Sequence, residues 1–167
     1  MTKRIRQYIG IMSAVAAYYL IHEGAHLICA LMMGTFKQIN VIGLGIQIDV
    51  EAASMTSWQM ALFCVAGTLA TLFVAYCLTL AARVIAEVKS PLLRAVMYYI
   101  TIALLLLDPL YLSLLCGLFG GGDMNGIRLV CPELLVRGVF AGILVINGIV
   151  FVKHVLPIYQ KSFQNNK

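Results

Sequence analysis

The sequence is poor in charge: only 11% of its 167 residues are acidic or basic, whereas 62% are apolar. Soluble domains contain about 25% charged and about 45–50% apolar residues, so this composition excludes a soluble globular domain. At about 20 residues for each span, the apolar runs account for about four membrane helices and leave no length for a separate soluble domain. We therefore expect an integral, multi-pass protein of the cell membrane.

Paired cysteines are also absent. The five cysteines are scattered singly, with no Cys-x-x-Cys motif: Cys29, Cys64, Cys77, Cys116 and Cys131. Neither a disulfide framework nor a cysteine zinc site is therefore predicted. The 12 basic residues outnumber the 7 acidic ones, but they lie at the ends of the apolar runs. That position indicates membrane orientation and contact with the lipid bilayer, and it predicts no binding of nucleic acid.

Residues 1–167 are predicted to form one all-α polytopic membrane domain with a small membrane-associated β-hairpin. The helices are expected at about residues 6–33, 58–82, 92–119 and 132–152, and the hairpin at about 36–51. Within the hairpin, Ile46, Ile48 and Val50 alternate with polar residues, which is the period of a strand. Gly43 and Gly45 indicate its turn.

Two breaks interrupt the second half of the chain. Pro109, which follows Asp108, is expected to kink the third helix or to end its first part. Three glycines at 120–122 precede Asp123 and cannot form a stable regular helix. Such backbone is tolerated at membrane depth where it lines a cavity or is buried in protein. From Lys153 onward the chain is expected to form a short polar tail.

One motif carries the chemistry: His22-Glu23-Gly24-Ala25-His26 lies inside the first apolar run. On a helix, an HExxH motif places two imidazoles one turn apart on one face with a carboxylate beside them, which is the arrangement of a zinc hydrolase. A central acid in a membrane span costs about 2.5–3.5 kcal/mol on insertion scales, so these residues need a function. We predict that His22 and His26 bind Zn²⁺.

Zinc needs a third protein ligand, and two aspartates are candidates because His154 is expected in the tail. Asp108 lies about 16 residues into the third helix and His22 about 16 residues past Arg6, so both could lie about 24 Å from the same membrane face. Asp123 follows the glycines, whose flexible backbone could bend inward and present the carboxylate. The residues themselves leave both candidates open.

These features resemble the site-2 protease family of intramembrane zinc metalloproteases over roughly residues 10–130. The HExxH match is complete. Residues 66–71 are similar to the family's Ala-Gly-Pro-x-x-Asn segment, with Thr68 and Thr71 in place of the proline and the asparagine. The family's third ligand lies in a Leu-Asp-Gly motif. Asp123 matches it as an aspartate followed by a glycine at longer spacing, and Asp108 matches only Leu-Asp, so the chain resembles a minimal, divergent member.

The resemblance implies an intramembrane zinc endopeptidase that cleaves a transmembrane or membrane-associated peptide substrate. It favours Asp123 over Asp108 as the third ligand, and it makes Glu23 the catalytic general base for a zinc-activated water. The hairpin would hold the substrate in an extended form. The alternatives are a membrane metal carrier or sensor built from the same residues, and an inactive relative that binds membrane partners. No feature of the sequence predicts an oligomeric state.

The distribution of lysine and arginine predicts the orientation. With four helices, nine of these residues lie on the side of the termini, and three lie opposite: Lys37, Arg128 and Arg137. The positive-inside rule then places both termini in the cytoplasm and the metal site nearer the external face. Bacterial site-2 proteases usually place the site nearer the cytosol, but we follow the charge count because it comes from this chain.

A protease-protection experiment tests this orientation. Tags fused to either terminus should survive protease added outside intact cells, because the membrane shields the cytoplasmic side. A tag inserted after Arg128, on the opposite side, should be cleaved and serves as the positive control. Digestion of both terminal tags would contradict the predicted orientation.

Overall fold

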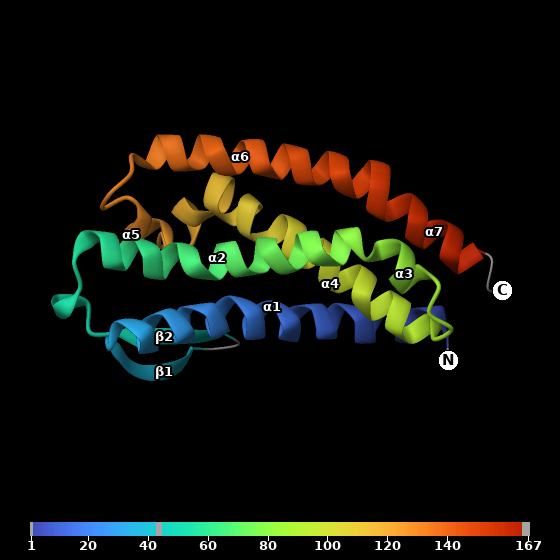
Figure 1. The fold of residues 1–167 in the computed structure, drawn as a ribbon, viewed down its shortest axis with the longest axis horizontal. Coiled ribbons are helices and arrows are strands. Elements are labelled where there is room, and N and C mark those ends of the chain that lie inside the picture. Colours follow the sequence, from blue (N-terminus) through green and yellow to red (C-terminus); the bar gives the residue numbers. More distant parts are fainter. Residues whose placement is uncertain (1, 43–44, 165–167) are drawn as a thin grey trace.

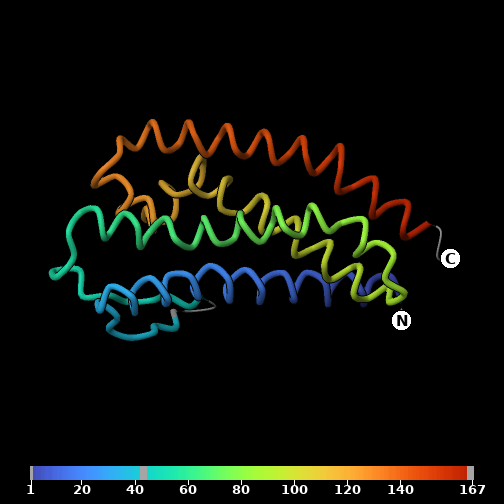
Figure 2. Tube along the Cα trace, in the orientation of Figure 1, coloured from blue at the N-terminus to red at the C-terminus, as the bar shows by residue number. Residues whose placement is uncertain are grey.

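The chain folds as an elongated helix bundle (Figure 1). The computed structural model describes residues 2–42 and 45–164. Four helical stretches are long and apolar enough to cross a membrane, in agreement with the composition: Lys3–Met33, Ser57–Leu80, Pro91–Leu118 and Glu133–Gln164. Both ends of the chain lie at one end of the bundle and the hairpin lies at the other, as the trace in Figure 2 shows. Such an arrangement is what four successive crossings produce.

Helix α1 (Lys3–Met33) begins before the predicted residue 6 because Thr2 caps it. The Thr2 hydroxyl accepts a hydrogen bond from the backbone N–H of Ile5 at 3.4 Å, which satisfies one of the free donors at a helix start. The helix ends at Gly34, whose φ of 67° favours glycine and whose N–H bonds back to the last turn. The motif helix is therefore fixed at both ends by short-range signals.

The predicted hairpin is confirmed. Strand β1 (Phe36–Ile42) pairs antiparallel with β2 (Gly45–Val50), with an irregularity between Phe36 and Gln38. The predicted turn residue Gly43 lies outside the described residues. Strand β2 packs along the C-terminal part of α1, and the carbonyl of Thr35 accepts a hydrogen bond from the N–H of Glu51 at 2.8 Å. The hairpin thus lies beside the part of α1 that carries the motif.

Helix α2 (Ser57–Leu80) begins with a capping box. The hydroxyl of Thr56 accepts from the N–H of Gln59 at 3.3 Å, and the Gln59 side chain accepts from the N–H of Thr56 at 2.8 Å. The helix ends at Leu80, just before the predicted residue 82, and a short helix α3 (Ala82–Ala86) follows. The capping box fixes where α2 begins, and so which face of the helix carries Gly67, Thr68 and Thr71.

The third span breaks where the proline predicts. Helix α4 (Pro91–Leu110) ends one residue after Pro109 and continues as a π-turn, η2 (Tyr111–Leu115), and a short 3-10 turn. Proline has no N–H, so the carbonyl of Leu105 loses its partner within the helix. The side-chain amide of Asn147 donates to this carbonyl at 2.7 Å and accepts from the Tyr76 hydroxyl at 2.9 Å. Asn147 therefore links the break to two other helices.

The fourth helical stretch is longer than predicted. Helix α6 (Glu133–Val150) passes through a π-turn, η4 (Phe151–Val155), into α7 (Leu156–Gln164). The prediction of an end at residue 152 and a polar tail is wrong, because Val155 and Tyr159 recur one turn apart and are buried against Leu104 and Leu105. The segment after residue 152 is polar in overall composition, but apolar residues line one face of the helix.

Buried apolar residues form two clusters along the bundle. One includes Ala30, Phe63 and Leu112 near the hairpin, and the other includes Leu104 and Val155 nearer the chain ends. Helix α1 contributes Leu27 and Ala30 to the first cluster and Tyr18 and Ile21 to the second, and the motif histidines lie between these two sets along the helix. The polar centre therefore lies within the bundle, with apolar packing on both sides.

Candidate metal centre

Helix α1 turns both motif histidines into the bundle. His22 and His26 are 7% and 3% exposed, as expected for residues four apart on the buried face of one helix. Their Nε2 atoms lie 3.1 Å apart. Two imidazoles are thus held together with little exposure to solvent, so most of their nitrogen atoms need a partner within the protein.

The remaining ring nitrogens have partners that fix the tautomers. Nδ1 of His26 lies 2.7 Å from the carbonyl oxygen of Phe63, which can only accept, so Nδ1 donates its proton there. Nδ1 of His22 lies 3.3 Å from the carboxylate of Asp108, another acceptor. Both rings are therefore held with the proton on Nδ1, which leaves a lone pair on each Nε2 as a metal ligand requires.

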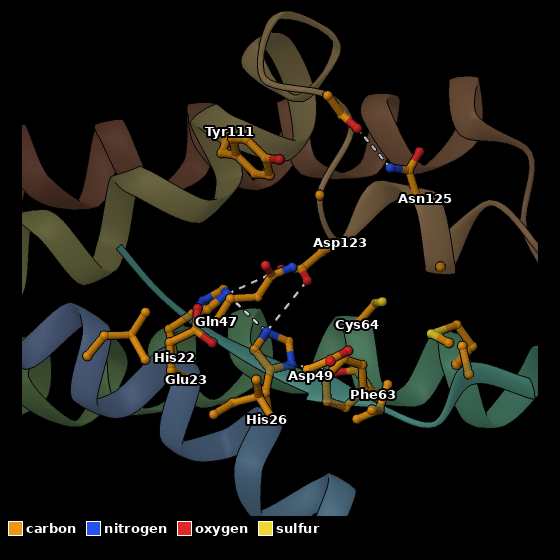
Figure 3. Close-up of a pocket in the computed structure, with 18 of the residues that line it drawn as sticks. His22, Glu23, His26, Gln47, Asp49, Phe63, Cys64, Tyr111, Asp123 and Asn125 are labelled. Atoms are coloured by element: carbon orange, nitrogen blue, oxygen red, sulfur yellow. Dashed lines mark hydrogen bonds and ion pairs between the residues drawn. The ribbon is translucent and has the colours of Figure 1, made fainter. Parts of the chain in front are cut away.

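Asp123 completes the group. Its carboxylate oxygens lie 3.2 Å from Nε2 of His22 and 3.5 Å from Nε2 of His26 (Figure 3). The backbone reaches this position through three glycines with φ angles of 77°, 88° and 44°, values that residues with a side chain rarely adopt. The Asn125 side chain donates to the carbonyl of Gly120 at 2.8 Å and so fastens the turn.

The ionisation of Asp123 suits a ligand. Burial would raise the pKa of this carboxyl, but when His22 and His26 are protonated on Nε2, their hydrogen bonds and positive charges outweigh burial and lower the pKa from 3.8 to about 2. The group is therefore a carboxylate at physiological pH.

The three donor atoms fit zinc. Ligands at about 2.0–2.1 Å from a tetrahedral zinc ion lie about 3.3 Å from one another. The two Nε2 atoms lie 3.1 Å apart, Nε2 of His22 lies 3.2 Å from Oδ2 of Asp123, and Nε2 of His26 lies 3.5 Å from Oδ1, the other carboxylate oxygen; all three distances are close to that value. Two lone pairs and a carboxylate that face one another also repel unless a cation or protons lie between them. The donor set and its spacing therefore suit a divalent ion with N and O ligands.

Asp108 occupies a different place. It meets the Nδ1 side of the His22 ring, away from the Nε2 atoms, and it is 1% exposed. The sequence allowed Asp108 and His22 to lie at the same depth, and the structure brings the two side chains into contact. The carboxylate accepts hydrogen bonds from the hydroxyls of Tyr18, at 2.5 Å, and Thr71. Asp108 thus holds the ring of His22, and Asp123 is the aspartate that faces both Nε2 atoms.

Sequence reasoning missed three contributors. Thr71, noted only as a departure from the family pattern, bonds to Asp108, and Tyr18 gave no signal of its own. Gly67 of α2 makes space for the centre: a Cβ atom there would lie 2.6 Å from Nε2 of His26 and 2.7 Å from Nε2 of His22. A pattern of period four on α1, which would place Tyr18 in line with His22 and His26, could have found the tyrosine.

A cavity of about 870 Å³ opens beside the three donors. Glu23 and Asp123 line it, as do Tyr111 and the residues of β2 from Ile46 to Val50 (Figure 3). The carboxylate of Glu23 accepts a hydrogen bond from the backbone N–H of Ile48. The acid of the motif is thus held outside the donor set, between the histidines and the strand.

Fold and site together define a class: a helical protein with four potential membrane spans among the described residues, in which two buried histidines meet a partly buried aspartate next to a glutamate. No protein-family model, curated protein or solved structure matches this chain. The resemblance to site-2 proteases therefore rests on the sequence motifs alone.

Zinc affinity separates the roles of the two aspartates. Asp123→Ala should lose zinc almost completely because it removes a ligand, whereas Asp108→Asn should weaken binding by only about 10–100-fold because it disturbs the orientation of one. Competition with a chelator in detergent measures both values against the unmodified chain. A larger loss in Asp108→Asn than in Asp123→Ala would reverse the assignment.

Gly67→Ala tests the space around the donors. The added methyl group would meet the Nε2 atoms of both histidines, so zinc content should fall sharply while the chain still folds. Gly142→Ala in α6 is the matched control, because a Cβ there meets no atom within 4 Å. Full zinc binding by Gly67→Ala, measured by metal analysis of the purified protein, would place the ion elsewhere.

Proposed function

We propose that the chain is an intramembrane zinc endopeptidase of the site-2 protease type, acting on transmembrane or membrane-associated peptides. The observation that carries the proposal is one cavity in which three metal-binding atoms, a glutamate and the edge of a strand lie together. Binding of a metal alone would need only the first of these. Hydrolysis of a peptide bond in a substrate held in an extended form would use all three.

The three ligand residues are arranged to hold a metal ion that would act as a Lewis acid. Zinc held by His22, His26 and Asp123 would supply a Lewis acid that activates water and polarises the scissile carbonyl. The chain's contribution is to keep both Nε2 atoms unprotonated through the Phe63 carbonyl and Asp108. Among the described residues three such donors come together, so a bound zinc ion would leave room for water on the side of the cavity.

Glu23 is placed to act as the general base. Its neighbours in sequence bind the metal, and its own carboxylate lines the cavity instead of joining the donor set. From there it would take the proton of the attacking water and pass it to the leaving amine nitrogen. The hydrogen bond from Ile48 holds the carboxylate at the strand, where the scissile bond would lie.

The outer edge of β2 suits an extended substrate. In an antiparallel pair, alternate residues turn their backbone groups away from the partner strand. The N–H of Ile48 bonds to Glu23 and so points outward, and by the period of two the backbone groups of Ile46 and Val50 share that direction. A substrate helix that has unwound locally could add to this edge by main-chain hydrogen bonds next to the donors.

Access to the centre favours the hairpin end. His26 lies seven residues before the end of α1 at Met33, a rise of about 10 Å. The cavity therefore lies close to the level at which the hairpin begins. Water and a partly unwound substrate would need to travel only about two helical turns from that end.

Glu23→Gln is the decisive variant. Loss of the general base should reduce cleavage by about 10²–10⁴-fold, while zinc stays bound because the residue is not a ligand. The assay would use zinc-loaded protein in detergent, with β-casein and tagged single-span helices as probes, and metal analysis of the same samples.

Glu51→Gln provides the matched control, because this exposed acid adjoins the hairpin but does not line the cavity. It should cleave at the rate of the unmodified chain. Undiminished cleavage by Glu23→Gln would overturn the mechanism. A zinc-loaded, unmodified chain that cleaves none of the probes would favour the carrier, the sensor or the inactive relative.

A further inference from the structure

A second cavity, of about 610 Å³, lies at the end of the bundle opposite the hairpin. It is enclosed by the start of α1, the start of α4 and the end of α7, three helix ends that lie at the same end of the bundle in Figure 1. The proposed proteolysis uses none of its residues. Its lining nevertheless contains a charged group whose burial costs free energy, and a ligand of opposite charge would lower that cost.

That group is Arg94, which is 1% exposed. Its Nη1 donates to the backbone carbonyl and to the hydroxyl of Ser162, at 2.8 and 2.6 Å, and its guanidinium lies 5.5 Å from the ring centre of Phe163. These partners are neutral. Buried Nε has no hydrogen-bond partner, and no carboxylate forms an ion pair with Arg94 within residues 2–42 and 45–164. A buried cation without a counter-charge is costly, and a bound anion would offset that cost.

The other polar residues of the cavity also suit an anion. Lys3 and Arg6 line it together with Arg94, and none of its described lining residues is acidic. Glutamines 7, 160 and 164 add neutral amide donors. Three positive charges that share one cavity repel one another, and a bound anion would convert this repulsion into attraction. The metal-site cavity has the opposite character, with Glu23, Asp49 and Asp123 in its lining.

The position of the cavity indicates the source of the anion. Lys3 and Arg94 lie in the first turns of two spans, which is the level of lipid headgroups when these helices cross a membrane. Tyr98 and Tyr99 line the same cavity and suit that interface. Arginine and lysine are the residues that bind phosphate, and basic pockets between spans accommodate phospholipid headgroups.

We propose that this cavity binds the phosphate group of an anionic phospholipid. Arg94 would donate from its buried edge, and Arg6 and Lys3 would close over the headgroup from α1. The lipid would join α1, α4 and α7 at the end of the bundle that lies farthest from the metal centre.

Native mass spectrometry of the full chain tests the proposal. In detergent with equal amounts of phosphatidylglycerol and phosphatidylcholine, the unmodified chain should retain phosphatidylglycerol preferentially. Arg94→Gln should lose this preference by about tenfold or more, because a charge-assisted hydrogen bond is lost. Arg6→Gln, which alters a partly exposed residue, provides a second variant in case Arg94→Gln does not fold.

Arg83→Gln is the matched control: it removes the same charge from the same end of the bundle, but Arg83 is exposed and outside the cavity. It should bind lipid as the unmodified chain does. Equal retention of the two lipids, or an equal loss in Arg83→Gln and Arg6→Gln, would overturn the proposal. A rise in melting temperature with inorganic phosphate, without preference for phosphatidylglycerol, would keep a phosphate site but overturn its assignment to lipid.

Discussion

The structure depends on holding two imidazoles where little of either ring is exposed to solvent. Each buried ring nitrogen needs a partner, and those partners come from three other segments: the Phe63 carbonyl on α2, Asp108 on α4, and Asp123 after the glycines. Asp108 is in turn satisfied by Tyr18 and Thr71. The requirement to pair buried polar groups therefore sets how α1, α2 and α4 must lie relative to one another.

The irregular parts of the chain bring the two aspartates to the histidine rings. Pro109 ends the regular part of α4 immediately after Asp108, and Asn147 takes up the carbonyl that the proline leaves unpaired. The chain then changes direction through the π-turn and the three left-handed glycines, and so Asp123 returns to the histidines. Such breaks would weaken an ordinary membrane helix. In this chain they bring Asp108 and Asp123 to opposite sides of the His22 ring.

Charge is divided between the two ends of the bundle. Glu23, Asp49 and Asp123 face the cavity at the hairpin end, and Lys3, Arg6 and Arg94 face the cavity at the end with the termini. The apolar cluster that includes Leu104 and Val155 lies between the two cavities and separates them. A cation centre and an anion site can therefore exist in one small bundle without neutralising each other.

Short-range patterns in the sequence predicted the four apolar spans, the hairpin and the HExxH pair, because spacing along one helix or strand decides which side chains share a face. The same patterns placed the end of the fourth helix too early, since its polar residues outweighed the stripe of Val155 and Tyr159. The choice between Asp108 and Asp123, the roles of Tyr18 and Thr71, and the space left by Gly67 needed the folded chain. These contacts join His22 to residues 86 and 101 positions away in the sequence. Contacts over such distances depend on how the helices pack against one another, and local periodicity carries no information about that packing.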